Sequence, residues 1–370
     1  MLLLCLSTQV SAQSPLFKKV LDVLKKDVLS EASRNLNESP ITVTNDQSTR
    51  SAGGKHDFFS EGDYWWPDPA NLNGPYIQKD GLSNPANFTA HRKAMIRFSQ
   101  IVANQTSAYL ITGRPIYAQH AIKHIKAWFV DTTTMMAPHL LYAQAIKGKV
   151  TGRGVGIIDM IQLIEVAKSI EILEKNRLVS LKDRELIHAW FTHYLKWVTS
   201  HPYGIDEREA KNNHGTCWVM QVSAFAQLVN DTTLLNYCKD RFLNVILPTQ
   251  MDERGAFPLE LKRTKPYGYS IFNLDAVLTT AHIFKEKNIT LKRAIDFLYP
   301  YVEEKNIWPY PKDVMYWDEW PVAAPFLLFG YQDYADNRWL NTWKKLAHFP
   351  ENEEVIRNLP IRNPLIWLVD

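Results

Sequence analysis

Apolar residues recur at the spacing of one helix face along most of the chain, and the strict alternation expected of strands is scarce. In residues 14–36, apolar positions such as Val20 and Leu24 predict an amphipathic helix. The same period in residues 94–113 predicts a second helix, with Gly113 as its glycine C-cap.

Further segments with this period follow one another to residue 305. They are residues 115–131, 156–176, 184–200, 215–230, 233–251, 270–288 and 291–305. Helices in sequential pairs, joined by loops of uneven length, predict an all-α fold: an (α/α) toroid or barrel of helical hairpins around a central cleft. The absence of a fixed-period repeat argues against a solenoid, but periodicity does not determine whether the ring closes.

Residues 36–90 break this pattern. They are polar, rich in Pro, Gly, Asn and Asp, and include the aromatic stretch DYWWPDP at residues 63–69. The segment is too long for a simple connection and too aromatic for a disordered linker, so we predict an ordered, functional loop.

The first twelve residues contain an apolar run followed by Val-Ser-Ala, which a signal peptidase would cut after Ala12. We therefore predict a signal peptide over residues 1–12, truncated at its start because no basic residues precede the apolar run. Residues 13–370 would form a single domain. The prediction is a bacterial protein that is periplasmic or secreted.

The composition is that of a soluble globular protein, with 46% hydrophobic and 22% charged residues. A net charge of +3 with scattered basic residues argues against nucleic-acid binding, and no later segment is apolar for long enough to span a membrane. We expect a monomer. After the leader only Cys217 and Cys238 remain, and two buried free thiols are favoured over a disulfide.

The stretch KNNHGTCW, residues 211–218, places amides beside a histidine. The imidazole of His214 can accept a proton near neutral pH, and Asn213 can bind a carboxylate or orient the ring. The alternative is structural: Asn212 or Asn213 caps a helix that begins near Gly215, and His214 lies alongside.

A second stretch, LELKRTKPYGYSIFNL at residues 259–274, places Arg263 six positions before Tyr269. An arginine lowers the pKa of a nearby phenol and can also grip a substrate carboxylate at two points. Glu260 would serve either the substrate or a simple ion pair with Arg263 or Lys262.

The glycines in residues 148–156 do not complete a phosphate-binding loop, so a nucleotide site is disfavoured. Arg153 lies among them and could approach an anionic ligand closely. The histidines are scattered, and we predict no metal site and no cofactor.

One reaction needs this combination of side chains: β-elimination at a 4-linked uronic acid. The C5 proton is weakly acidic, so the neighbouring carboxylate must be neutralised before a base can remove that proton. An acid must also protonate the departing O4. Asn, Arg, His and Tyr supply these functions.

The motifs DYWWPDP, DGLSNP, YAQAIKGKVTGRGVGIID, KNNHGTCW and ELKRTKPYGYSIFNLDA together resemble the alginate lyase superfamily of polysaccharide lyases with helical toroid folds. The resemblance covers residues 60–290 and is nearest to a branch of bacterial alginate and glucuronan lyases. It implies an acidic polysaccharide, alginate or glucuronan, as the substrate.

By this resemblance, Asn213 and Arg263 neutralise the substrate carboxylate, and His214 and Tyr269 form the base and acid pair. Tyr269 is chosen over Tyr267 because YSIFNL continues the motif. Further candidates for sugar contacts are Tyr64, Trp65, Trp66, Tyr142, Gln144, Arg153, Asn212, Glu260 and Tyr267.

Two other functions remain open on the sequence. A glycoside hydrolase would need two well-placed carboxylates, for which Asp63, Asp159 and Glu260 can be nominated. A non-catalytic uronan-binding protein would use the same aromatic and arginine side chains.

Overall fold

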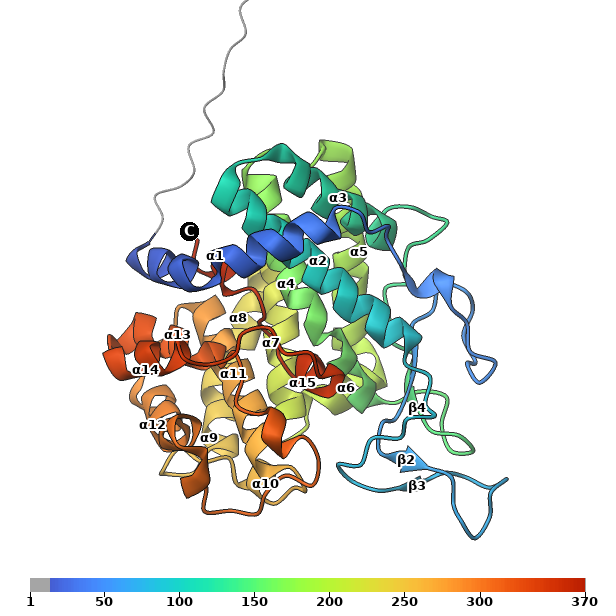
Figure 1. Cartoon of the computed structure of the whole chain (residues 1–370). Helices are drawn as coiled ribbons and strands as arrows, with labels where there is room; N and C mark the ends of the chain where they lie inside the picture. Colours follow the sequence, from blue (N-terminus) through green and yellow to red (C-terminus); the bar gives the residue numbers. More distant parts are fainter. Residues whose placement is uncertain (1–13, 370) are drawn as a thin grey trace, which may run out of the picture.

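The computed structural model describes residues 14–369, and the predicted signal peptide lies outside them. The all-α prediction is confirmed: helices make up the body of the molecule, and the few strands are short and lie to one side (Figure 1).

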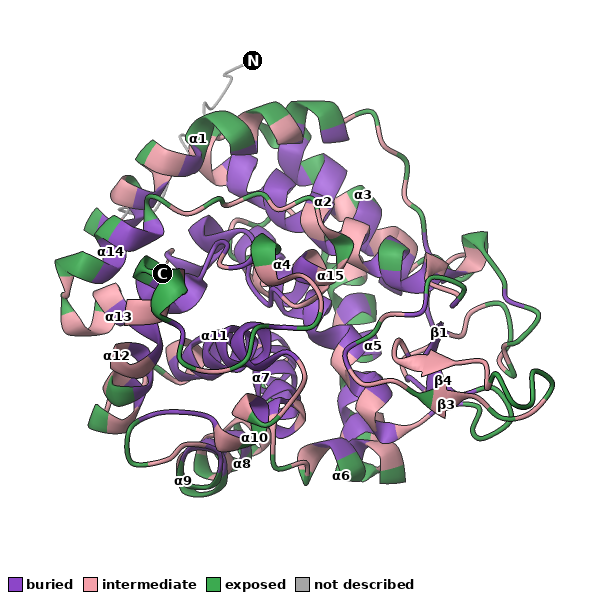
Figure 2. Ribbon diagram, turned by 60° about the horizontal axis from the view of Figure 1, so that its bottom comes forward, coloured by how far each residue is buried: buried purple, intermediate pink, exposed green. Residues whose placement is uncertain are grey.

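Five helices that are buried on most sides form an inner row. They are α2 (Ala90–Thr112), α4 (Leu163–Lys175), α7 (Asn213–Leu228), α11 (Pro266–Phe284) and α13 (Pro325–Tyr334). Each contacts the next in this order. Figure 2 shows α7 and α11 almost wholly buried. Their sequences are apolar or small on every side, and a helix of that kind is stable only inside a core.

Amphipathic helices alternate with the inner ones along the chain and form an outer layer. They are α3 (Pro115–Phe129), α5 (Leu181–Ser200), α8 (Thr232–Arg241) and α12 (Ile289–Glu303). Helices α3, α8 and α12 pack on the inner helix that precedes each, whereas α5 packs on α3 and α7. Each covers the inner row with its apolar face.

The N-terminal helix α1 (Pro15–Asn35) connects the two ends of the inner row. It packs along α2, and its Lys19 Nζ donates a hydrogen bond of 2.6 Å to the Tyr331 hydroxyl of α13. The 3₁₀ turn Pro364–Trp367 at the other end of the chain also contacts α1, α2 and α4. Segments far apart in sequence therefore close the ring, which explains why periodicity alone did not reveal the closure.

Two predicted helices differ from their expected form. The segment at 156–176 begins as a 3₁₀ helix, Gly154–Gln162, before α4. The segment at 233–251 is divided into α8, a π turn at Phe242–Ile246 and α9 (Leu247–Gln250). Pro248 has no backbone N–H to donate in the last turn, which favours a break in the regular ladder there.

The predicted ordered loop is present between α1 and α2. Its strand β1 (Phe59–Glu61) pairs in parallel with β4 (Tyr142–Ala145), and β2 (Trp65–Trp66) pairs antiparallel with β3 (Ile77–Gln78). Side chains fix its backbone: Asn84 Nδ2 donates to the Trp65 carbonyl at 2.8 Å, and Asn87 Nδ2 donates to the Gly62 carbonyl at 2.9 Å.

Short elements complete the chain: α6 (Pro202–Arg208), α10 (Pro258–Leu261), α14 (Asn337–Trp343) and α15 (Glu353–Arg357). Cys217 and Cys238 are buried and free, as predicted. Within residues 14–369 no helix has both the length and the apolar character that crossing a membrane would require.

Candidate active site

The four stretches singled out in the sequence meet at one end of the inner helices. KNNHGTCW begins α7, and the segment containing Arg263 leads into α11. The glycine-containing segment after β4 and the aromatic loop around β2 lie against them, because Arg153 packs over the Trp65 ring and the Tyr64 hydroxyl reaches Tyr269.

Asn213 is held by Glu260 at the start of α7. Its backbone N–H donates to Glu260 Oε1 at 2.7 Å, and its Nδ2 donates to Oε2 at 2.8 Å. Burial raises the pKa of Glu260, while the hydrogen bonds from Asn213 and the charge of Arg263 oppose that shift. A carboxylate at a helix N-terminus also interacts favourably with the helix dipole.

These contacts correct two predictions. Asn212 occupies the N-cap position but its side chain makes no capping hydrogen bond, so a glutamate far along the chain satisfies the helix end instead. The Glu260 side chain is buried and accepts from Asn213 instead of forming the predicted ion pair with Arg263 or Lys262, so it positions Asn213.

His214 receives its orientation from Glu207 in α6. Its Nδ1 lies 2.8 Å from Glu207 Oε1, and the Glu207 side chain is fully buried. A carboxylate can only accept a hydrogen bond, so this contact favours the tautomer with the proton on Nδ1 and the lone pair on Nε2. Sequence reasoning missed Glu207, because no motif spacing connects it with His214.

Arg263 forms a two-point ion pair with Asp80 of the aromatic loop. Its Nη2 and Nε donate to the two Asp80 carboxylate oxygens at 2.8 and 3.2 Å. Burial opposes the charge of Arg263, but the hydrogen bond and charge of Asp80 outweigh it and raise the pKa of the guanidinium. Asp80 begins the DGLSNP motif, which was noted as a pattern without a role.

Tyr269 lies beside Arg263, whose guanidinium is 4.6 Å from the centre of the phenol ring. The Tyr269 and Tyr64 hydroxyl oxygens are 2.8 Å apart. Burial raises the pKa of Tyr269 well above its usual range, and the charges of Lys265 and Arg263 oppose that shift only in part. The phenol is therefore protonated at neutral pH.

Tyr267 has a different environment, which corrects its place among the predicted sugar contacts. It is fully buried, its hydroxyl donates to the Tyr301 carbonyl at 2.9 Å, and its ring packs against Trp308. Two residues along a helix correspond to about 200° of rotation, so Tyr267 and Tyr269 face opposite ways.

Lysine and arginine side chains lie over the rings of the two tryptophans in the loop. Lys149 and Arg153 lie 5.2 and 5.9 Å from the Trp65 ring centre, and Lys79 lies 5.1 Å from that of Trp66. Such pairs place positive charge next to flat apolar surfaces. They give this edge of the site positive charge and flat apolar surface side by side.

Gln144 anchors the glycine-containing segment. Its Oε1 accepts from Arg153 Nη2 at 2.9 Å, and its backbone has a left-handed φ of 49°. A non-glycine residue in this conformation is strained, and such strain concentrates at functional sites. The neighbouring Tyr142 is half-buried, and its ring lies so close to Gly53 that a Cβ there would be 2.5 Å from it.

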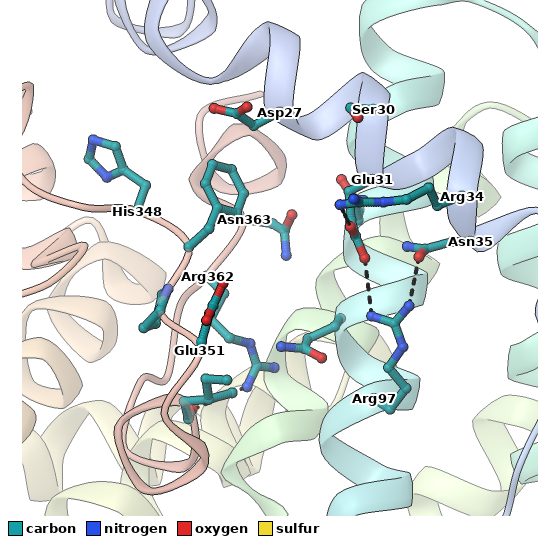
Figure 3. Close-up of a pocket in the computed structure, with 15 residues that line it drawn as sticks. Asp27, Ser30, Glu31, Arg34, Asn35, Arg97, His348, Glu351, Arg362 and Asn363 are labelled. Atoms are coloured by element: carbon teal, nitrogen blue, oxygen red, sulfur yellow. Dashed lines mark hydrogen bonds and ion pairs between the residues drawn. The ribbon is translucent and has the colours of Figure 1, made fainter. Parts of the chain in front are cut away.

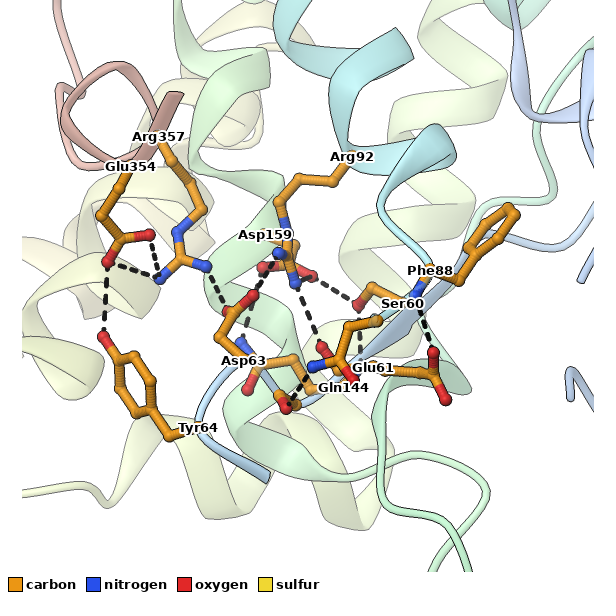
Figure 4. A network of polar contacts seen from close by, with 12 residues as sticks. Ser60, Glu61, Asp63, Tyr64, Phe88, Arg92, Gln144, Asp159, Glu354 and Arg357 are labelled. Carbon is orange, nitrogen blue, oxygen red and sulfur yellow. Dashed lines mark hydrogen bonds and ion pairs between the residues drawn. The ribbon is translucent and has the colours of Figure 1, made fainter. Parts of the chain in front are cut away.

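Behind the site lies a chain of buried charges that sequence reasoning did not assemble (Figure 4). Asp63 lies between Arg92 and Arg357, with Arg92 Nη1 at 2.6 Å, and Arg92 also reaches Asp159 at 3.3 Å. Burial opposes ionisation of Asp63, but the charges and hydrogen bonds of the two arginines lower its pKa to about 2. Arg357 continues the chain to Glu354 at 3.3 Å.

Two pockets flank this region. One of about 630 Å³ is lined in part by Asp63, Arg92, Tyr316, Glu354 and Arg357. The other, of about 450 Å³, lies between α1, α2 and the C-terminal segment (Figure 3). Its Arg97 is paired with Glu31 and Asn35, and none of the predicted site residues lines it.

The chain resembles known proteins in sequence and in fold. Residues 42–308 match the alginate lyase family. An alginate lyase from Bacteroides ovatus has a similar structure, with a TM-score of 0.79 and 28% sequence identity over 98% of this chain and 99% of that chain. A comparison with curated proteins finds no match.

More distant structures share the fold. Alginate lyase A1-III from Sphingomonas species A1 gives a TM-score of 0.52 at 14% identity, covering 89% of this chain and 91% of that chain. A variant of alginate lyase A1-III complexed with a tetrasaccharide gives 0.53 at 15% identity, covering 87% of each chain. The predicted helical toroid is thereby confirmed.

The fold and the family match define the protein as a polysaccharide lyase built on a helical toroid. The chain belongs to the alginate lyase family.

The Glu207 contact gives the first testable prediction. Glu207→Gln replaces a pure acceptor with an amide that can donate to Nδ1 of His214, which would move the imidazole proton to Nε2. We expect kcat for polysaccharide cleavage to fall by about 100-fold or more with little change in KM, because the lone pair of Nε2 would no longer be available to accept a proton.

Glu209→Gln is the matched control, since Glu209 is exposed and pairs with Arg208 and Arg241 outside the site. Steady-state kinetics on both variants make the comparison. Equal kcat in Glu207→Gln and the wild type would show that Glu207 does not set the tautomer of His214.

Proposed function

We propose that this protein cleaves 4-linked uronic acid polymers by β-elimination, with alginate as the first candidate substrate and glucuronan as the second. The observation that carries the proposal is the convergence of Asn213, His214, Arg263 and Tyr269, each held by its own buried or charged partner. The similarity to the Bacteroides ovatus alginate lyase supports the choice of alginate.

Asn213 and Arg263 are assigned to the substrate carboxylate. Glu260 fixes the amide of Asn213, and Asp80 takes the Nε and Nη2 groups of Arg263, so that we assign Nη1 to the sugar. Both groups donate hydrogen bonds to the negative charge that grows on the carboxylate as C5 loses its proton. Donors that are already in place lower the barrier without reorganising.

His214 and Tyr269 are assigned to proton transfer. Nε2 of His214 has a lone pair and suits the removal of the C5 proton, whereas the protonated Tyr269 suits donation to O4. The face of the sugar ring that carries the C5 hydrogen decides which of the two acts as base for a given epimer. The reaction needs no metal or cofactor in this scheme, because side chains supply the neutralising charge.

The sugar chain would lie along the aromatic loop. Its predicted contacts that remain compatible with the structure are Tyr64, Trp65, Trp66, Tyr142, Gln144, Arg153 and Asn212. The cations beside Trp65 and Trp66 suit a polymer with one negative charge per sugar. We further propose that the protein is exported to the periplasm or secreted and acts as a monomer.

The hydrolase alternative has less support. The carboxylates nominated for it are already engaged: Asp63 with two arginines, Asp159 with Ser60 and Arg92, and Glu260 with Asn213. A general acid or nucleophile of a glycosidase needs a carboxyl group free to meet the glycosidic bond. A binding protein would need neither the orientation of His214 nor the burial of Tyr269.

Incubating the purified protein with alginate and with glucuronan tests the proposed reaction. We expect purified protein to generate 4,5-unsaturated ends, seen as new ultraviolet absorbance, on alginate or glucuronan. New reducing ends without that absorbance would establish the hydrolase instead. Binding without shortening of the chains would establish the binding protein.

Tyr269→Phe tests the assigned acid, with Tyr267→Phe as its matched control. We expect Tyr269→Phe to lower kcat by at least about 100-fold while oligosaccharide binding persists, because only a proton donor is removed. Tyr267→Phe should keep normal turnover and lose about 1 kcal/mol of stability with its buried hydrogen bond. Near-normal turnover in Tyr269→Phe would remove it from the catalytic set.

A further inference from the structure

Helix α15 brings a carboxylate to the proposed acid from the far end of the chain. Glu354 accepts a hydrogen bond from Lys265 Nζ at 2.7 Å and one from the Tyr64 hydroxyl at 3.4 Å. Its side chain is 10% exposed, and that of Lys265 is 5% exposed. Neither residue belongs to the set predicted from the sequence.

These contacts determine which tyrosine hydroxyl donates a hydrogen bond and which accepts it. Burial opposes ionisation of Glu354, but the charges of Arg357 and Lys265 outweigh it and lower the pKa of this carboxyl. An ionised carboxylate only accepts, so Tyr64 donates its single hydroxyl hydrogen to Glu354. The Tyr64 oxygen is then the acceptor for the hydroxyl hydrogen of Tyr269, 2.8 Å away.

Lys265 places a cation among the aromatic rings. Its Nζ is 5.1 Å from the ring centres of both Tyr64 and Tyr269, and 5.3 Å from that of Tyr316. Positive charge over a phenol ring stabilises negative charge on that phenol more than it stabilises the neutral form. The ion pair with Glu354 keeps this buried cation in place.

Resting on the proposed function, we propose that Glu354 and Lys265 are a positioning pair for Tyr269, acting through the Tyr64 hydroxyl and through the charge of Lys265. During elimination, C5 gives its proton to His214, the C4–O4 bond breaks, a C4–C5 double bond forms, and O4 takes the proton of Tyr269. Tyr64 then turns its hydrogen from Glu354 towards the Tyr269 oxygen, and Lys265 faces the new negative charge.

Other charged groups contribute to the same field. Arg263 precedes α11 and faces the Tyr269 ring, with Asp80 as its counter-ion. From α15, Arg357 faces Glu354 and Tyr64 and is paired with Asp63. Arg263 and Lys265 thus both place a cation over the Tyr269 ring, and Glu354 acts on Tyr269 through Lys265 and the Tyr64 hydroxyl.

The test compares Glu354→Gln, Lys265→Met and the double variant, with Glu351→Gln as control. Glu351 is an exposed carboxylate on the same segment. We expect both single variants to lower kcat on the uronan by about 10- to 100-fold with KM unchanged, because the acid is misplaced but the sugar contacts remain. Glu351→Gln should match the wild type.

The dependence of kcat on pH separates positioning from simple loss of structure. Removing the negative charge of Glu354 lowers the pKa of the tyrosine hydroxyls, so the alkaline loss of activity should begin at a lower pH in Glu354→Gln. Removing the positive charge of Lys265 raises the pKa of the tyrosine hydroxyls. The alkaline loss of activity should therefore begin at a higher pH in Lys265→Met. A merely structural defect would not shift the two variants in opposite directions.

Thermal unfolding completes the test. Glu354→Gln leaves the buried Lys265 without its carboxylate, and Lys265→Met leaves Glu354 with Arg357 alone, so each should unfold at a lower temperature. The double variant should recover much of that loss but not its kcat. If a single variant fails to fold, Tyr64→Phe removes the connecting hydroxyl but keeps the ring, and it should lower kcat by a larger factor than it changes KM. Wild-type-like kcat and pH profile in Glu354→Gln would overturn the inference; absence of unsaturated ends with the wild type would instead overturn the proposed function.

Discussion

The buried contact of Asp63 with Arg92 and Arg357 is the interaction on which the site depends. It joins three parts of the chain that are far apart in sequence: the aromatic loop, the first turn of α2 and helix α15. A carboxylate between two guanidinium groups offsets the cost of burying all three charges, and removing one partner would leave an uncompensated charge inside the protein. The loop that carries Tyr64 and the tryptophans is therefore fixed relative to the helical ring.

A carboxylate likewise holds each side chain to which we assign a role in the reaction. Glu207 orients His214, Glu260 holds Asn213, Asp80 grips Arg263, and Glu354 holds Lys265 beside Tyr269. Each carboxylate comes from a different element from its partner. The acidic residues in this region thus serve to orient the groups that would meet an anionic polymer, and the groups left to face that polymer are donors, cations and aromatic rings.

Much of the fold could be predicted because helix periodicity is a local property. The segments that form α7 and α11 are predicted as helices from their apolar spacing, and the glycine at 113 ends α2 in the left-handed conformation expected of a C-cap. Tyr267 packs against Trp308, whereas the Tyr269 hydroxyl reaches Tyr64, a difference that their spacing in the sequence indicates without saying which of them faces the site. The partners could not be predicted, since Asp63 and Arg357 are 294 positions apart and only the closed ring brings them together.

The most direct test of the account is a crystal structure of the Tyr269→Phe variant with a bound uronan oligosaccharide. The account predicts one sugar carboxylate within hydrogen-bonding distance of Asn213 and Arg263, with C5 of that sugar facing His214 and its O4 facing the side chain at position 269. An oligosaccharide bound with its carboxylates elsewhere, or with C5 turned away from both His214 and position 269, would contradict it.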